Sequence, residues 1–248
     1  MIRFLLPFLF IMSVANNSFA ACPQSSAVIG AKYKITLNKP NEKTSSSRYF
    51  VLLRNNNQVA HQYSGSAITE VWQQTNNASL RLVRYFDKYK RGIEYQPNEI
   101  NNGKGERNWD VKNQLITDKL IKSMQQKSVN GKGCDKVKRY TLKTNNKLIN
   151  LEWLSQRRLL KTYSETTTSG KLKWKLVNII TNKNQINNVF SSREDYQTTD
   201  YTDIGDNESD PFLIKMINLG FVEHAASGFY DANGNLLKSN TSGRHHQH

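Results

Sequence analysis

The stretch KLKWKL, residues 171 to 176, alternates strictly between lysine and large apolar residues. Successive side chains of a strand point to opposite faces of a sheet. The pattern therefore places Lys171, Lys173 and Lys175 on a face in water, and Leu172, Trp174 and Leu176 on a buried face. An antiparallel sheet with one covered side produces such a strand. The chain must supply other elements to cover that side.

Similar short runs, rich in β-branched and aromatic residues, recur along the chain. Turn-forming segments such as NNN, SGS and TNNAS separate them. The first set is YKITL, RYFVLLR, QVAHQY, AITEVWQQ and LRLVRYF, and the second is VKRYTLK, LINLEWL, RLLKTYSET and KLKWKLVNII. The sequence therefore predicts an antiparallel meander from about residue 31 to 95 and a second set of strands up to residue 180.

One helical pattern lies between these two sets, in WDVKNQLITDKLIKSMQQ. Its apolar residues recur near helical spacing, and Asp110 lies in the first turn, where a negative charge stabilises a helix. We expect one inserted helix at about residues 109–126, packed on a sheet face. The fold class is then α+β, mainly antiparallel β.

The first twenty residues have the anatomy of a secretory signal peptide. Met1 to Arg3 carry a positive charge, FLLPFLFIMSVA is an apolar run too short to span a membrane, and Ser18-Phe19-Ala20 is a small-x-small cleavage site. We expect cleavage near Ala20 and a soluble mature chain in the periplasm or outside the cell.

Two cysteines, Cys22 and Cys134, are present. An even number in an exported chain indicates a disulfide. Cys22 directly follows the cleavage region, so lipidation is the alternative, but Phe19 and the polar residues before it depart from a lipobox. The prediction is a Cys22–Cys134 bridge.

Charge divides the chain into two parts. Residues 32 to 183 hold 30 basic and 11 acidic residues, whereas residues 184 to 248 hold 4 basic and 9 acidic. We therefore expect a basic β-rich domain over residues 21–183. An acidic helical and hairpin part, residues 184–248, packs on the same domain and ends in a flexible His-containing tail over 240–248.

The acidic stretch contains a helix start. Asp210 is an N-cap residue, Pro211 suits the first helical position, and Gly220 suits the end. Two interpretations of the other acids stay open. They lie against the basic sheet and screen it, or they bind a hard cation that wants several oxygen ligands. The candidate metal ligands are Asp203, Asp206, Glu208 and Asp210.

Further candidates are a hairpin and the histidines. Asn233-Gly234 between GFY and LLK predicts a two-residue hairpin turn. His245, His246 and His248 could bind a divalent metal, or belong to a flexible tail or a cloning remnant. His61 reads as a residue of a sheet. No Ser/His/Asp order, Gly-rich phosphate loop or HExxH motif is present, so no catalytic residue is assigned.

Residues 136 to 180 resemble the strand series of the periplasmic lipoprotein-carrier superfamily, the half-open barrels of the LolA and RseB type. Trp153, Leu159, Leu160 and the run from Trp174 to Ile180 fill the aromatic and hydrophobic positions of that series. The resemblance implies a curved or half-open barrel-like sheet packed on a few helices, with an apolar concavity for acyl chains or a partner segment.

We therefore expect an exported binding protein for a lipid, lipoprotein or other anionic envelope component, or for an envelope protein. The candidate ligand-binding residues are Trp153, Trp174, Arg157, Arg158, Lys171, Lys173 and Lys175. Nucleic acid would also suit the positive charge, but export makes it a less available partner. No cofactor is expected beyond a divalent cation. The alternatives are a periplasmic metal-handling protein, which would use the acidic loop or the His tail, and then an envelope hydrolase.

Overall fold

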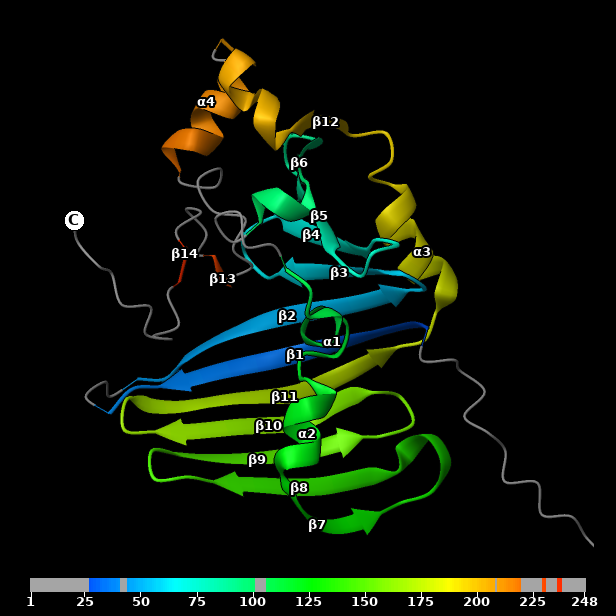
Figure 1. Cartoon of the computed structure of the whole chain (residues 1–248), viewed down its shortest axis with the longest axis vertical. Coiled ribbons are helices and arrows are strands. Elements are labelled where there is room, and N and C mark those ends of the chain that lie inside the picture. Colours follow the sequence, from blue (N-terminus) through cyan, green and yellow to red (C-terminus); the bar gives the residue numbers. More distant parts are fainter. Residues whose placement is uncertain are drawn as a thin grey trace, which may run out of the picture.

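The computed structural model describes residues 27–40, 44–100, 106–207 and 209–219, together with the strand residues 229–230 and 236–237. Figure 1 shows a tall sheet with helices on both faces and at one end. The elements are β1 (Val28–Asn38), β2 (Ser46–Asn55), β3 (Gln58–Tyr63), β4 (Ile68–Gln74), β5 (Leu80–Phe86), β6 (Arg91–Tyr95), η1 (Pro97–Glu99), α1 (Trp109–Gln114), α2 (Asp118–Ser123), β7 (Gln125–Asn130), η2 (Gly133–Asp135), β8 (Val137–Lys143), β9 (Lys147–Leu154), β10 (Leu159–Thr167), β11 (Gly170–Ile180), α3 (Lys183–Ser191), β12 (Gln197–Asp200), η3 (Tyr201–Asn207), α4 (Pro211–Asn218), β13 (Phe229–Tyr230) and β14 (Leu236–Leu237).

Twelve strands form one sheet in the order β12-β6-β5-β4-β3-β2-β1-β11-β10-β9-β8-β7. Both predicted strand sets are present as meanders, β1 to β6 and β7 to β11. The pairing of β1 with β11 joins them into one layer. All neighbours are antiparallel except β12, which lies parallel to β6. The predicted fold class, mainly antiparallel α+β with a curved, half-open sheet and a few helices, is confirmed.

The two faces of the sheet have different coverings. The inner face, as we call it, carries the main hydrophobic core and is crossed by α1 and α2, which lie in front of the strands in Figure 1. The opposite, outer face is covered at one end by α3. There Ile186 and Phe190 pack on Leu53, Ala60 and Val71. Successive residues of a strand therefore face α1 and α2 on one side of the sheet and the α3 side on the other.

The expected single helix over 109–126 is two short helices, so that prediction is wrong in detail. Helix α1 ends at Gln114 because Leu115 adopts a left-handed conformation, with φ of 67°. Helix α2 restarts after Thr117, whose side chain accepts a hydrogen bond from the backbone N–H of Leu120. A Thr-Asp pair inside the periodic run was the sequence signal for this restart. Residues after Met124 continue as β7 instead of helix.

Helix α4 begins as its sequence predicts. The side chain of Asp210 accepts a hydrogen bond from the backbone N–H of Phe212, and Pro211 lies in the first turn. Arg91 donates a hydrogen bond to Asp210 over 2.7 Å, and this contact holds the pKa of the Asp210 carboxyl below its ordinary value. The ring of Phe212 packs edge-on against Phe86. The helix therefore caps the end of the sheet near β5 and β6.

Two smaller predictions are also confirmed. Phe229 and Tyr230 pair with Leu237 and Leu236 as an antiparallel hairpin, although its turn, with Asn233 and Gly234, lies outside the described residues. His61 is a buried residue of β3. In the described part of the chain, no helix is long and apolar enough to cross a membrane.

Candidate functional site

A row of aromatic and aliphatic residues crosses the inner face at the junction of the two meanders. Ile35 on β1 pairs with Trp174 on β11, and Trp174 pairs in turn with Tyr163 on β10. The Trp174 ring lies 5.9 Å from the ring of Tyr33 and 5.4 Å from that of Phe50, both in edge-on geometry. Such contacts fix the indole in one orientation. The row is a preorganised aromatic surface.

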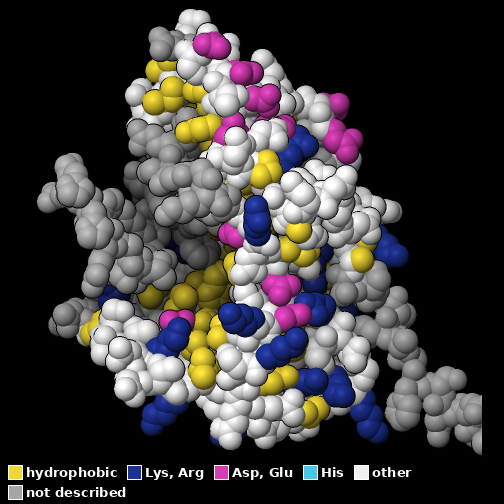
Figure 2. Space-filling model, viewed as in Figure 1, with side chains coloured by type: hydrophobic (Ala, Val, Ile, Leu, Met, Phe, Trp, Pro, Cys, Tyr) yellow, Lys and Arg dark blue, Asp and Glu magenta, His cyan; other side chains and the backbone are white. Residues whose placement is uncertain are grey.

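This surface is only partly covered. Tyr33 and Phe50 are buried, but six residues of β8, β10 and β11 that pack on the same core keep part of their side chains exposed: Tyr140, Leu142, Tyr163, Leu172, Trp174 and Leu176. Figure 2 shows hydrophobic side chains gathered in a hollow beside α1 and α2, over β1, β10 and β11. We call these six residues the apolar hollow. A half-exposed aromatic and aliphatic lining of this kind is typical of a site for an apolar ligand.

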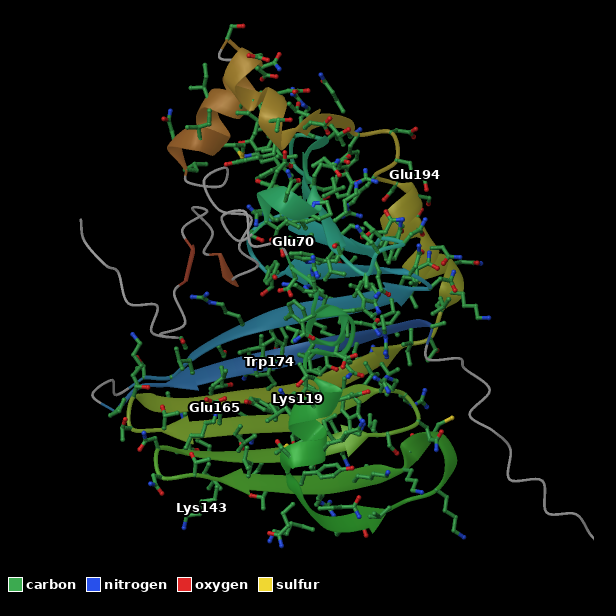
Figure 3. All side chains as sticks on the ribbon, viewed as in Figure 1. Glu70, Lys119, Lys143, Glu165, Trp174 and Glu194 are labelled. Carbon is green, nitrogen blue, oxygen red and sulfur yellow. The ribbon has the colours of Figure 1, made fainter. Side chains whose placement is uncertain are left out.

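One acidic residue lies on the same face as the apolar hollow. Glu165 on β10 pairs with Leu172 and accepts a hydrogen bond from the Tyr163 hydroxyl over 2.6 Å. Burial and the Glu165 carboxylate raise the pKa of the Tyr163 hydroxyl. Figure 3 labels Glu165 and Trp174 on neighbouring strands beside the helices. Sequence reasoning missed Tyr163 and Glu165, although their spacing of two residues places them on one face.

The helices that border the apolar hollow are held to the sheet by a buried charge. We call residues Asn108 to Ser123, which include α1 and α2, the strap. Lys112 of α1 is 5% exposed, with its ammonium 3.9 Å from the centre of the Trp72 ring and 3.6 Å from Glu106. Burial lowers the pKa of this ammonium, while Glu70 and Glu106 oppose that change. The strap is therefore anchored through a cation in the core.

The groups beneath Lys112 form an ionic cluster. Arg84 and Glu70, both fully buried, make an ion pair of 2.8 Å, and the Tyr63 hydroxyl donates to the second oxygen of Glu70. The neighbouring His61 donates from Nε2 to the backbone carbonyl of Lys112 over 2.7 Å. Burial lowers the pKa of His61 to about 3. A neutral imidazole and a buried ion pair thus lie beneath α1 and support it.

The structure uses both predicted ligand-binding arginines to hold chain segments together. Arg158 lies at the turn between β9 and β10 and donates to both carboxylate oxygens of Asp118 on α2, each at 3.0 Å. It also lies 3.8 Å from Asp110 on α1. The guanidinium of Arg157 is 3.7 Å from Asp135, and its backbone carbonyl accepts from Arg54. Arg158 therefore ties both helices of the strap, α1 and α2, to the turn between β9 and β10.

The remaining predicted ligand-binding residues are divided between the two faces. Trp153 is buried in the core of the inner face and Trp174 lies in the apolar hollow. Lys171, Lys173 and Lys175 are exposed and alternate with the hollow residues, so they lie on the outer face. The expected alternation of KLKWKL is confirmed. One small ligand in the hollow cannot contact those lysines, because the sheet separates them.

The predicted acidic metal ligands are spread over the end of the fold. Asp203 lies in η3, and Asp210 is engaged as the α4 cap and as the partner of Arg91. Asp206 also lies in η3, whereas Glu208, His245, His246 and His248 lie outside the described residues. Among the residues that the structure describes, no group of three His, Cys, Asp or Glu is placed to hold a metal ion.

The predicted disulfide has one end in the described structure. Cys134 lies in η2 beside β8 and is not a free thiol, whereas Cys22 and the signal peptide, residues 1–20, lie outside the described residues.

If the chain is exported, as its first twenty residues predict, we expect no titratable thiol after denaturation without reductant, because an even cysteine pair in an exported chain is usually oxidised. Thiol titration of the purified mature chain checks this. Two free thiols would contradict the bridge, and a diacylglyceryl mass on Cys22 would replace it with lipidation.

The fold and inner face together define a class of protein: a half-open antiparallel barrel whose apolar inner face is partly covered by a helical strap. No protein-family model and no curated protein sequence matches this chain. Solved structures that resemble it are PNGF-II, an outer membrane lipoprotein-sorting protein domain from Vibrio parahaemolyticus, and a LolA-superfamily protein from Nitrosomonas europaea.

Their similarity to this chain is limited to the general fold. PNGF-II has a TM-score of 0.36 at 8% identity, over 70% of this chain and 31% of its own, so this chain spans less than a third of its length. The Vibrio domain has a TM-score of 0.32 at 10% identity, over 66% of this chain and 91% of its own. The Nitrosomonas protein has a TM-score of 0.27 at 7% identity, over 62% of this chain and 86% of its own. The resemblance expected from residues 136–180 is thus found again, but TM-scores below 0.5 carry no argument about ligand or activity.

Proposed function

We propose that this chain is an exported binding protein that holds the acyl chain, or another apolar part, of a lipid or lipoprotein in the apolar hollow. The observation that carries the proposal is the partly exposed aromatic and aliphatic lining around Trp174, which packs on the buried core. The six residues of the hollow pack on the core but stay partly exposed. An apolar ligand would remove their surface from water, which is favourable.

The strap gives the hollow a defined border. Leu115, Leu120 and Ile121 pack on the same core as the hollow residues and remain partly buried. Arg158 holds α2 by an ion pair that is about 40% exposed, so α2 can move at lower cost than α1, which the buried Lys112 also anchors. Movement of α2 would widen the hollow for a long chain.

Glu165 restricts where the charged head of a bound ligand can lie. Its carboxylate is bound to the Tyr163 hydroxyl and lies on the same face as the apolar residues. A negative group at this place disfavours a ligand whose own carboxylate or phosphate would lie beside it. We therefore place the anionic head of an amphipathic ligand outside the hollow, away from Glu165.

The test has two stages. Lipid extraction and mass spectrometry of the purified protein identify a ligand that copurifies. A fatty acid with a dansyl label then serves as the probe, with energy transfer from tryptophan as the signal. We expect Trp174→Ala to weaken binding of this probe by about tenfold or more, since 1.4 kcal/mol of lost contact corresponds to tenfold.

Val177→Ser is the matched control, because Val177 is 54% exposed on the same strand but on the outer face. It should bind the probe like the wild type. Equal affinity in wild type and Trp174→Ala, or an equal loss in both variants, would refute the hollow as the binding site. A stoichiometric metal in place of a lipid would favour the metal-handling alternative.

A further inference from the structure

The outer face carries a second surface with a different chemistry. Its exposed lysines come from two adjacent strands, β1 and β11, and we call them the lysine face: Lys32, Lys34, Lys171, Lys173 and Lys175. Lysines two residues apart on one strand are separated by about 6.7 Å, and neighbouring strands by about 4.8 Å. Five positive charges are thus fixed on one small, rigid area.

Within the described residues, these charges lie beside neutral side chains on the adjoining strand. None of the five lysines belongs to an ion pair in the described part of the chain. On the adjoining strand β10, the residues that pair with Lys175, Lys173 and Lys171 are Thr162, Ser164 and Thr166, which are neutral. The acid of that strand, Glu165, points to the inner face. The nearest acid in the same row, Glu152, already accepts from Arg139 and Thr162.

Two of the lysines oppose each other directly. Lys34 pairs with Lys175 across β1 and β11, an arrangement that is unfavourable in water because like charges repel. A sequence selected for folding alone has no reason to keep this pair. An anionic partner would neutralise both ammonium groups, so relief of their repulsion would add to the free energy of binding.

Exposed apolar groups lie among the lysines. Tyr49 is 42% exposed and has the Lys32 ammonium 4.8 Å from its ring centre, and Val177 is 54% exposed on β11. Tyrosine and lysine are both favoured where a protein contacts the headgroup region of a bilayer.

We propose that the lysine face docks this protein on an anionic lipid bilayer. The apolar hollow lies on the other side of the sheet, so docking leaves it uncovered. The docking site and the ligand site are therefore independent, and this proposal stands whether or not the hollow binds a lipid.

The test is sedimentation of the full mature chain with vesicles of 30% phosphatidylglycerol in phosphatidylcholine, and with pure phosphatidylcholine vesicles. We expect binding only to the anionic vesicles, and a steep decrease above about 150 mM salt, where charges are screened beyond about 8 Å. Lys34→Gln/Lys175→Gln should weaken this binding by about tenfold or more. Its melting temperature should not fall, because the substitution also removes the Lys34–Lys175 repulsion.

The matched control is Lys119→Gln/Lys122→Gln, which removes two exposed lysines from α2 on the inner side (Figure 3 labels Lys119). It should keep most of the vesicle binding. Equal losses in both double variants, equal binding to neutral and anionic vesicles, or no vesicle binding would each overturn the proposal. Binding to an acidic polymer such as heparin through Lys34 and Lys175, without vesicle binding, would assign the lysine face to another anionic partner.

Discussion

Glu70→Ala should lower the free energy of unfolding by about 3–5 kcal/mol, because it leaves the fully buried Arg84 without its carboxylate. The same change removes the hydrogen-bond acceptor of the Tyr63 hydroxyl and a negative charge that faces Lys112. The loss is measured by urea unfolding of the oxidised protein, with tryptophan fluorescence as the signal.

Glu152→Ala is the appropriate comparison, because its partner Arg139 is 42% exposed and the pair lies on the outer face. We expect it to cost about 0–1 kcal/mol. Glu70→Leu/Arg84→Leu should recover much of the loss, since an apolar pair of similar volume often replaces a buried ion pair without penalty. A Glu70→Ala variant no less stable than Glu152→Ala would show that the buried pair does not anchor the fold.

Acid should destabilise the protein strongly through His61. The folded chain keeps this imidazole neutral down to about pH 3, whereas an unfolded histidine takes up a proton near pH 6.5. Between these values the unfolded state binds more protons, so stability is complete above pH 6.5 and falls as the pH decreases. Over this gap the loss approaches about 5 kcal/mol, at 1.36 kcal/mol for each pH unit.

His61→Gln isolates this effect, because glutamine can donate to the Lys112 carbonyl but does not titrate. The variant should have a lower stability at pH 7 and a smaller dependence on pH between 6.5 and 4, by about one bound proton. The groups around the ring are the Lys112 ammonium, Glu70 on the paired strand position and the Phe50 ring. Identical pH profiles for the variant and the wild type would exclude His61 as the source of acid sensitivity.

The sequence predicted local structure better than long-range assembly. Period-two alternation identified the strands around Trp174, and the Asp210-Pro211 pair identified the start of α4, because each signal lies within a few residues. The pairing of β1 with β11 was not predictable in this way. This pairing depends on which unpaired strand edges meet after both meanders have formed. Patterns of a few neighbouring residues contain no information about it.

The candidate site shows the same limit. Trp153 and Trp174 were predicted as ligand residues, but only burial in the fold separates the core position of Trp153 from the half-exposed Trp174. Arg157 and Arg158 were predicted to bind a ligand, whereas the strap and η2 supply carboxylate neighbours for them. The sequence assigned no role to Lys112, whose burial goes with its contact with Trp72 on a distant strand.

The central position of β1 has a consequence for the order in which the chain assembles. Among the strands that the structure describes, β1 is synthesised first and β11 pairs with its free edge. The backbone groups of that edge therefore lack their strand partner until β11, which ends at Ile180, has been made. Hairpins between consecutive strands form quickly, but closing so long a loop is slow. During that interval the two halves each expose an apolar face and a strand edge, which favour aggregation. A chaperone that shields the first meander until the second arrives would therefore raise the yield of folded protein more than one that acts on the completed chain.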